Sequence, residues 1–489
     1  MNPRRPAKPV FDSELCLIGA PSDEALGAAV ARLLAFLDQA PTASLADVAF
    51  TTALMARHLP VVAAVVATSV ADLCEKLRTT ERRLREGAAR IRDKSGVYYT
   101  RERLAQSGGR IAFVFPGELS PYPHMLSGLC IAFPWCRAAF DETDDACAGY
   151  PDMFLMSEWV FPATPALRAE AGNPLTTLTG AMLAAHTANT ALARLFARLE
   201  IRPDAVVGHS IGDLAALETA GCYGDLSRVR RIAMLRDGIT LISHLDNHVR
   251  IPEAMILSVE GAAAREKTDA WLAADPGRVA LAMQNGPSSR LLAVAPDIAG
   301  EFRARLEQNR IRHTVMQSRL PGHTPWFAHG LPPIAQHLST WITREPALPL
   351  YSCATASVVE GRAPDIAAAC LEQWTQTVRF DQTIERMYAD GVRIFLEVGA
   401  RGLLAPQIEE QLSGRPHLAL AANRIHRSDM AQLHHVLGQL VSHGVACDLS
   451  MLHRHRGSRL LNLDHPEAVR TRPAQAVRLT AALPELRPF

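Results

Sequence analysis

A single serine stands between two glycines where an apolar run gives way to a helical pattern, in "DAVVGHSIGDLAALETAG" at residues 204–221. The run before Gly208 predicts a short buried strand, and the stretch after Gly212 predicts a helix that Gly221 closes. Glycine on both sides of the serine permits a tight turn. A strand, a sharp turn and a helix in succession are typical of α/β folds. Ser210 then either lies at the top of the turn or caps the following helix.

Length and composition narrow the class of protein. A chain of 489 residues is too long for one simple core and predicts two or three domains. The net charge of +1 argues against a partner such as nucleic acid or a membrane surface. The sequence has neither a signal peptide nor a run of about 18 apolar residues that would span a membrane. Nine scattered cysteines without a C-x-x-C pair predict reduced thiols, so a cytoplasmic protein is expected.

The first part of the chain, residues 1–105, predicts a small α/β domain. Apolar runs at 14–20 and 59–68 predict strands, and amphipathic patterns at 22–40 and 69–91 predict helices. This domain is expected to act as a linker that precedes the main fold.

A larger α/β domain is predicted over 106–425, with a smaller lobe inserted at about 252–318. The insertion has a β-α-β-β-α-β order, with "NGPS" as a hairpin turn, which is typical of a ferredoxin-like lobe. A small lobe set on a large one leaves a cleft, where ligands commonly bind. The remainder, 426–489, is rich in Arg and Pro and predicts a linker that wraps over other domains.

Several ordered motifs carry a resemblance to a known family. They are "FVFPGELSPYPHML", "RPDAVVGHSIGDLAALETAG", "MLRDG", "GHTPWF" and "ADGVRIFLEVGARGLLA". Between Arg110 and Leu412 the chain resembles the malonyl-CoA:acyl-carrier-protein transacylases, in particular the acyltransferase domains of type I polyketide synthases. Residues 14–105 resemble the linker that precedes such domains, and "GQLVSHGVACDLSML" resembles the segment that follows them. The resemblance implies a large α/β-hydrolase-like lobe with an inserted ferredoxin-like lobe.

The resemblance also implies a set of catalytic roles. Ser210 corresponds to the acyl-accepting serine and His323 to its general base. The backbone N–H groups of Glu118 and Ile211 would stabilise the oxyanion. A serine hydroxyl is a weak nucleophile at neutral pH, and an imidazole can take its proton and return it to the leaving thiolate. The carbonyl of Gln376 would orient that imidazole.

Substrate-binding roles are implied as well. Arg236 corresponds to the arginine that pairs with the free carboxylate of a malonyl group, since a guanidinium grips a carboxylate with two hydrogen bonds. His209 and Gly322 are also expected at the substrate. Gly322, which stands where the family carries a bulkier residue, predicts room for a larger α-substituent.

The implied activity moves a malonyl or α-substituted malonyl unit from CoA to the phosphopantetheine thiol of an acyl carrier protein. No bound cofactor and no metal are expected. The partners implied are the carrier protein and other polyketide synthase modules. Departures from the family, among them Glu118, Leu119 and Met182-Leu183, predict an acyl pocket unlike the ordinary malonyl one. Two alternatives stay open: an acyl hydrolase that clears carrier proteins, and a catalytically impaired docking module.

Overall fold

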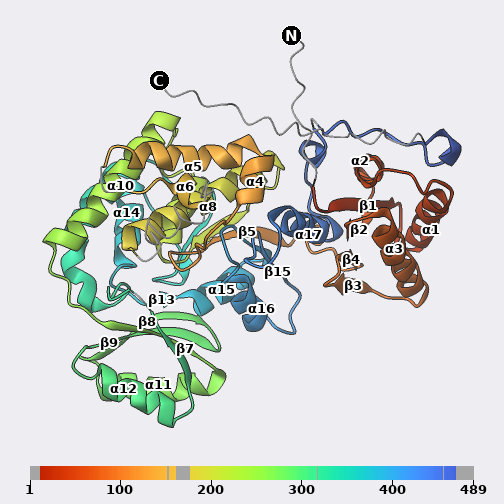
Figure 1. The fold of residues 1–489 in the computed structure, drawn as a ribbon. Helices are drawn as coiled ribbons and strands as arrows, with labels where there is room; N and C mark the ends of the chain where they lie inside the picture. Colours follow the sequence, from red (N-terminus) through yellow and green to blue (C-terminus); the bar gives the residue numbers. More distant parts are fainter. Residues whose placement is uncertain (1–10, 151–152, 161–176, 317, 455, 470–489) are drawn as a thin grey trace, which may run out of the picture.

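The computed structural model describes most of the chain and arranges it around three β-sheets (Figure 1). The described residues are 11–150, 153–160, 177–316, 318–454 and 456–469. Residues 1–10 and 470–489, which belong to the predicted N-terminal and C-terminal linkers, lie outside them. The predicted α/β class, with a large lobe and an inserted small lobe, is confirmed.

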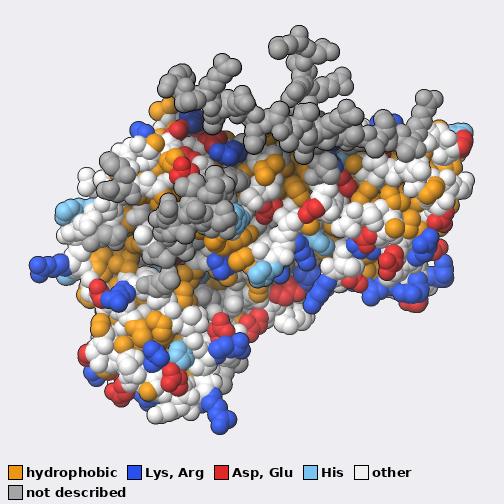
Figure 2. Space-filling model, viewed as in Figure 1, with side chains coloured by type: hydrophobic (Ala, Val, Ile, Leu, Met, Phe, Trp, Pro, Cys, Tyr) orange, Lys and Arg blue, Asp and Glu red, His pale blue; other side chains and the backbone are white. Residues whose placement is uncertain are grey.

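The N-terminal sheet is antiparallel, with strand order β1-β2-β4-β3. Its strands are β1 (Glu14–Ala20), β2 (Val61–Ala67), β3 (Arg90–Asp93) and β4 (Val97–Thr100), and its helices are α1 (Asp23–Gln39), α2 (Leu45–Ala56) and α3 (Val70–Arg85). The two predicted strands are present. The helix predicted to Ile91 ends at Arg85, and residues 90–93 form a strand instead. Lys and Arg side chains gather over α3 and β3 on the face that Figure 2 shows.

The six-stranded sheet of the large lobe has the order β12-β11-β6-β5-β14-β15. It consists of β5 (Arg110–Phe115), β6 (Ala205–Gly208), β11 (Leu350–Ser352), β12 (Ser357–Val358), β14 (Val392–Glu397) and β15 (Leu418–Ala421). All neighbouring strands are parallel except β11 and β12. Phe115 pairs with Gly208, so the loops after β5 and β6 leave the same edge of the sheet together. That edge is where open α/β sheets usually bind ligands.

Helices cover both faces of this sheet (Figure 1). They are α4 (Ser127–Ala132), α5 (Pro134–Cys147), α6 (Met156–Val160), α8 (Leu178–Arg198), α9 (Asp213–Thr219), α10 (Arg228–His248), α13 (Leu331–Trp341), α14 (Ala363–Glu372), α15 (Phe380–Ala389) and α16 (Ala405–Gln411). None of the helices among the described residues is both long and apolar enough to cross a bilayer.

The small lobe has the predicted β-α-β-β-α-β order. Its elements are β7 (Met255–Glu260), α11 (Ala262–Ala274), β8 (Val279–Gly286), β9 (Ser289–Val294), α12 (Ala299–Gln308) and β10 (Arg312–Val315). The sheet order is β10-β7-β9-β8-β13, in which β13 (Val378–Arg379) comes from later in the chain and runs parallel to β8. The turn expected at "NGPS" is shorter than predicted, because β8 extends through Asn285 to Gly286.

Helix α17 (Asp429–Ser442) packs against the N-terminal sheet and ties the C-terminal part of the chain to it (Figure 1). Two of its histidines make buried hydrogen bonds: His434 Nδ1 lies 2.9 Å from Ser13 Oγ, and His435 Nδ1 lies 2.5 Å from Tyr98 Oη. Beyond the helix, Arg456 forms a buried ion pair with Glu14, with Nη1 2.9 Å from Oε2. Segments from the first and last parts of the described chain therefore meet at strand β1.

The Glu14–Arg456 pair gives the first prediction. We expect Arg456→Met to destabilise the N-terminal unit by about 3–5 kcal/mol, because it leaves the Glu14 carboxylate buried without its counter-charge. Thermal unfolding together with hydrogen exchange over β1 measures the loss. Glu14→Gln combined with Arg456→Met is the control and recovers much of it, since no unpaired charge remains. Equal stability of Arg456→Met and the wild type would contradict the prediction.

Candidate functional site

Ser210 lies on a strained turn between β6 and α9. Its φ of +56° is in the left-handed region, which non-glycine residues rarely adopt. The two flanking glycines are required by close backbone approach. A Cβ atom on Gly208 would lie 2.2 Å from the backbone nitrogen of Asp213, and one on Gly212 would lie 2.1 Å from the carbonyl oxygen of Phe115. The Ser210 hydroxyl caps neither short helix, so the capping alternative is wrong.

His323 lies directly across from Ser210, although the two are 113 positions apart in the chain. Its Nε2 is 2.8 Å from Ser210 Oγ. Its Nδ1 is 2.7 Å from the carbonyl oxygen of Gln373, which can only accept, so Nδ1 carries the proton and Nε2 accepts from the serine. The ring stacks on Trp374 with an interplanar angle of 12°. The imidazole is therefore held in the tautomer that a general base needs.

The residue that orients His323 is Gln373, and the prediction of Gln376 is wrong. Helix α14 ends at Glu372, and carbonyl groups just beyond a helix end lack intrahelical donors. Gln373 and Trp374 use theirs to accept from the Nδ1–H and the backbone N–H of His323. The chain makes a further turn, in which the Gln376 N–H donates to the Glu372 carbonyl before β13 begins.

Burial controls the protonation of both histidines near the serine. It lowers the pKa of His323, and the nearby Glu118 carboxylate acts in the opposite direction. The pKa of His209 is lowered for the same reason, with a smaller opposing effect from its hydrogen bond to Asn285. Both rings are therefore neutral at neutral pH.

His209 connects the two lobes. Its Nε2 donates to Oδ1 of Asn285, at 2.8 Å, and Asn285 lies at the end of the small-lobe strand β8. The side chain is therefore engaged in an inter-lobe contact, and His209 is not among the residues that line the cavity described below. The sequence analysis predicts Asn285 only as part of the "NGPS" turn and misses its contact with His209.

The loop after β5 lies against the serine. A Cβ on Gly117 would be 3.2 Å from Ser210 Cβ. The backbone N–H groups of Glu118 and Ile211, the predicted oxyanion donors, make no hydrogen bond to any described residue. Arg401 fixes the loop by donating to the carbonyl of Pro121 at 2.7 Å and to that of Ser120 at 3.2 Å. Arg401 is a supporting residue that the sequence analysis missed, although it lies within a quoted motif.

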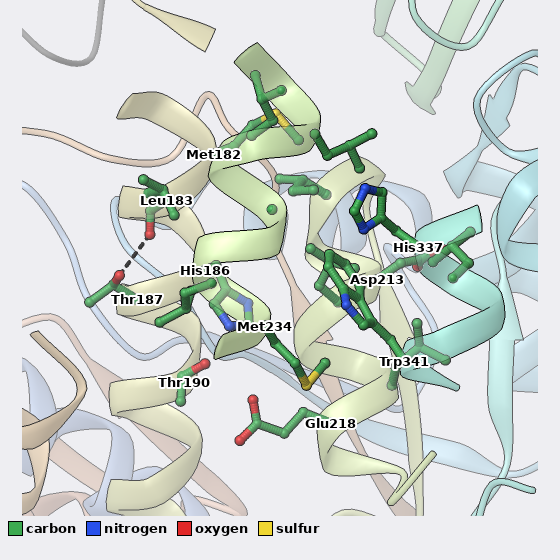
Figure 3. Close-up of a pocket in the computed structure, with 18 of the residues that line it drawn as sticks. Met182, Leu183, His186, Thr187, Thr190, Asp213, Glu218, Met234, His337 and Trp341 are labelled. Carbon is green, nitrogen blue, oxygen red and sulfur yellow. Dashed lines mark hydrogen bonds between the residues drawn. The ribbon is translucent and has the colours of Figure 1, made fainter. Parts of the chain in front are cut away.

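A cavity of about 120 Å³ extends from Ser210 between α8, α9, α10 and α13 (Figure 3). Its walls are mainly apolar. The apolar lining residues include Met182, Leu183, Met234, Leu235, Leu338 and Trp341. The arginines among the described lining residues are Arg194 and Arg231, and both pair with Glu142.

Arg236 does not line this cavity, so its predicted place at the substrate is wrong. The cavity-facing residues of α10 include Arg231, Met234, Leu235 and Gly238, which follow helical spacing. Position 236 falls outside that face. Its side chain is exposed, and its Nη2 donates to the carbonyl of Asp145 at 2.8 Å.

Gly322 borders open space, as the sequence suggested. A Cβ placed on it would meet nothing within 4 Å. It is nevertheless not one of the cavity-lining residues, whereas Leu320 is.

His244 and His248, four positions apart in the sequence, lie on helix α10 with exposed side chains and ring centroids 5.3 Å apart. Among the described residues no group of three or more His, Cys, Asp or Glu side chains has the geometry of a metal site.

Sequence comparison identifies the family. The model described as "Acyl transferase domain" matches residues 113–445, and one described as "CurL-like, PKS C-terminal" matches residues 14–77. A curated relative is the spectinabilin polyketide synthase system protein NorA of Streptomyces orinoci. It is 28% identical over 98% of this chain, which spans 24% of the length of NorA.

Solved structures share the fold. The acyltransferase domain from module 8 of the salinomycin polyketide synthase is 24% identical, with a TM-score of 0.72 over 90% of this chain and 98% of that domain. The acyl transferase domain of ZmaA is 20% identical, with a TM-score of 0.75 over 93% of this chain and 100% of that domain. The family model covers more than half of the sequence, so this chain belongs to the acyl transferase domain family and has polyketide synthases as its relatives.

Proposed function

We propose that the chain transfers an acyl group from a CoA thioester to the phosphopantetheine thiol of an acyl carrier protein, through an ester on Ser210. The observation that carries the proposal is the hydrogen-bonded series from Ser210 Oγ to His323 Nε2, and from His323 Nδ1 to the Gln373 carbonyl. An intact series of this kind argues against the catalytically impaired docking module.

In the first half-reaction Ser210 Oγ attacks the thioester carbonyl while His323 Nε2 takes the hydroxyl proton. The N–H groups of Glu118 and Ile211 donate to the tetrahedral oxyanion, a contribution of about 3–4 kcal/mol for a single donor in other enzymes. His323 then returns the proton to the leaving CoA sulfur. In the second half-reaction the carrier thiol gives its proton to His323 and its sulfur attacks the acyl-serine carbonyl. The ester bond to Ser210 Oγ then breaks as His323 passes that proton to Oγ, which restores the free hydroxyl and the neutral imidazole.

The acyl group that fits the cavity best has no free carboxylate. The malonyl prediction depended on Arg236, whose side chain is exposed and bonded to Asp145. Leu235 lines the cavity at the neighbouring position, and the two arginines of the lining are already paired with Glu142. A malonyl carboxylate buried there without a counter-ion would cost several kcal/mol. We therefore propose a monocarboxylic acyl chain of medium length as the donor group.

A second candidate is the acyl hydrolase. It is also favoured because position 235 of the described cavity wall is a leucine and not an arginine that would bind a malonyl carboxylate. A hydrolase would use the same serine and histidine, with water as the acceptor. Transferase and hydrolase differ in how long the acyl-serine survives without a carrier thiol.

The first test follows acyl-serine by intact-protein mass spectrometry after addition of octanoyl-CoA. We expect octanoyl on the wild-type chain, none on Ser210→Ala, and acylation slowed by about 10²–10⁴-fold in His323→Ala, since that variant lacks the base. A persistent acyl-enzyme supports the transferase, and rapid release of octanoate supports the hydrolase. Failure of every thioester both to label the protein and to yield free acid would refute both.

The second test is the pH dependence of acylation. Burial lowers the pKa of His323, so the base stays neutral below the usual histidine value, and the rate at pH 6.5 should exceed half of its plateau. Since Glu118 raises that pKa, Glu118→Gln should move the acidic limb to still lower pH while keeping the backbone N–H. Stopped-flow release of CoA across pH measures both. A limb that moves upward in Glu118→Gln would contradict the assignment.

The third test compares donor groups. We expect wild-type acylation by octanoyl-CoA to exceed that by malonyl-CoA on the order of a hundredfold, because the described lining residues offer no unpaired arginine or lysine. Leu235→Arg should reduce this ratio by supplying one. Arg236→Ala is the matched control on the same helix and should leave the ratio unchanged. A wild-type preference for malonyl-CoA would contradict the proposed donor class but not the proposed acylation of Ser210.

A further inference from the structure

Part of the cavity lining is polar. Its polar side chains include His186 and Thr190 from α8 and Glu218 from α9, all labelled in Figure 3, and we call these three the polar end of the cavity. Glu218 follows Ser210 by eight residues along a helical segment, which places it about 12 Å further along at about 1.5 Å per residue. A polar group at that depth serves no step of the proposed reaction at the serine.

His186 and Thr190 are one helical turn apart on α8, so they share one face. Nδ1 of His186 and Oγ1 of Thr190 are both buried and have no hydrogen-bond partner among the described residues. Thr190 is only 7% exposed. Burial lowers the pKa of His186 to about 4, so its ring is neutral and offers one donor and one acceptor.

Thr187, the residue after His186 on the same helix, is satisfied in contrast. Thr187 donates to the Leu183 carbonyl at 2.7 Å and bonds Thr143 at the same distance. Buried polar atoms in folded proteins nearly always have partners, because an unmet hydrogen bond costs about 1–3 kcal/mol. An unsatisfied pair beside a cavity therefore points to a group that enters the cavity.

Glu218 completes the polar end. Its carboxylate makes no hydrogen bond or ion pair with the described residues, because the nearby arginines are committed to Glu142. Arg231 contacts both carboxylate oxygens of Glu142, at 3.0 and 3.1 Å, and Arg194 contacts one at 2.7 Å. Burial raises the pKa of Glu218. A hydrogen-bond donor from a ligand would relieve this desolvated group.

We infer that the acyl group carried by Ser210 ends in a hydroxyl, which is recognised by Glu218, Thr190 and His186 at the polar end of the cavity. The inference rests on the proposed function and adds the substrate class. A hydroxyl donates to the Glu218 carboxylate and accepts from Thr190 or His186. The apolar walls, among them Met234 and Leu338, contact the methylene chain between this hydroxyl and the ester.

In the experiment the full-length chain is incubated with an equal mixture of octanoyl-CoA and ω-hydroxyoctanoyl-CoA. The mass of the acyl-enzyme is then measured by intact-protein mass spectrometry. We expect the hydroxylated chain to predominate on the order of tenfold or more, because a site built to bond a hydroxyl rejects the analogue that lacks it. Glu218→Leu and Thr190→Val, which remove hydrogen-bonding groups at nearly constant size, should lower this ratio to one or below. Arg236→Ala, outside the cavity, should retain it, and a thermal melt checks folding of each variant.

The outcomes separate the two proposals. Equal labelling by both thioesters in the wild type, or an unchanged ratio in Glu218→Leu and Thr190→Val, overturns the hydroxyl site while Ser210 chemistry stands. No labelling by either thioester removes the proposed function, and the inference with it.

Discussion

The contact between Ser210 and His323 is the interaction on which the rest of the site depends. The backbone conformation at each residue brings the two side chains together. The serine reaches its position only through a left-handed turn, and that turn exists because the chain passes too close to itself at Gly208 and Gly212 for any side chain. The histidine is also in the left-handed region, with φ of +64°. Such strain persists only where the surroundings over-determine the conformation. Here the parallel strands β5 and β6 fix one partner and the end of α14 fixes the other.

Burial of the site then decides its chemistry. It keeps the imidazole of His323 neutral, as a base requires, and gives the cavity walls a low polarity that suits a hydrocarbon chain. The same low polarity makes every charge inside expensive, so the arginines of the lining are paired with Glu142. The proposed donor selection therefore depends on which polar groups of the cavity lining are left unpaired, more than on the overall fold.

The sequence predicted what depends on local pattern. The strand, turn and helix around Ser210 are encoded within twenty residues, and the order of elements in the small lobe follows from alternating patterns. The wrong predictions of site residues arose where a shift of one to three positions changes which side chain or carbonyl group reaches the site. On α10 a shift of one residue rotates a side chain by about 100°, which separates Leu235 from Arg236. Likewise, an extra turn after α14 makes Gln373 the partner of His323 instead of Gln376.

Long-range pairing was beyond prediction because nothing local encodes it. Strand β13 has two residues and joins the small-lobe sheet beside β8, with Arg379 opposite Gln284. It follows closely on the segment whose carbonyl group at Gln373 holds His323, and Asn285, the last residue but one of β8, holds His209. The supports of both histidines are thus joined through one sheet. The small lobe therefore helps to position both imidazoles, since one of its strands carries the partner of His209 and another follows closely on the partner of His323.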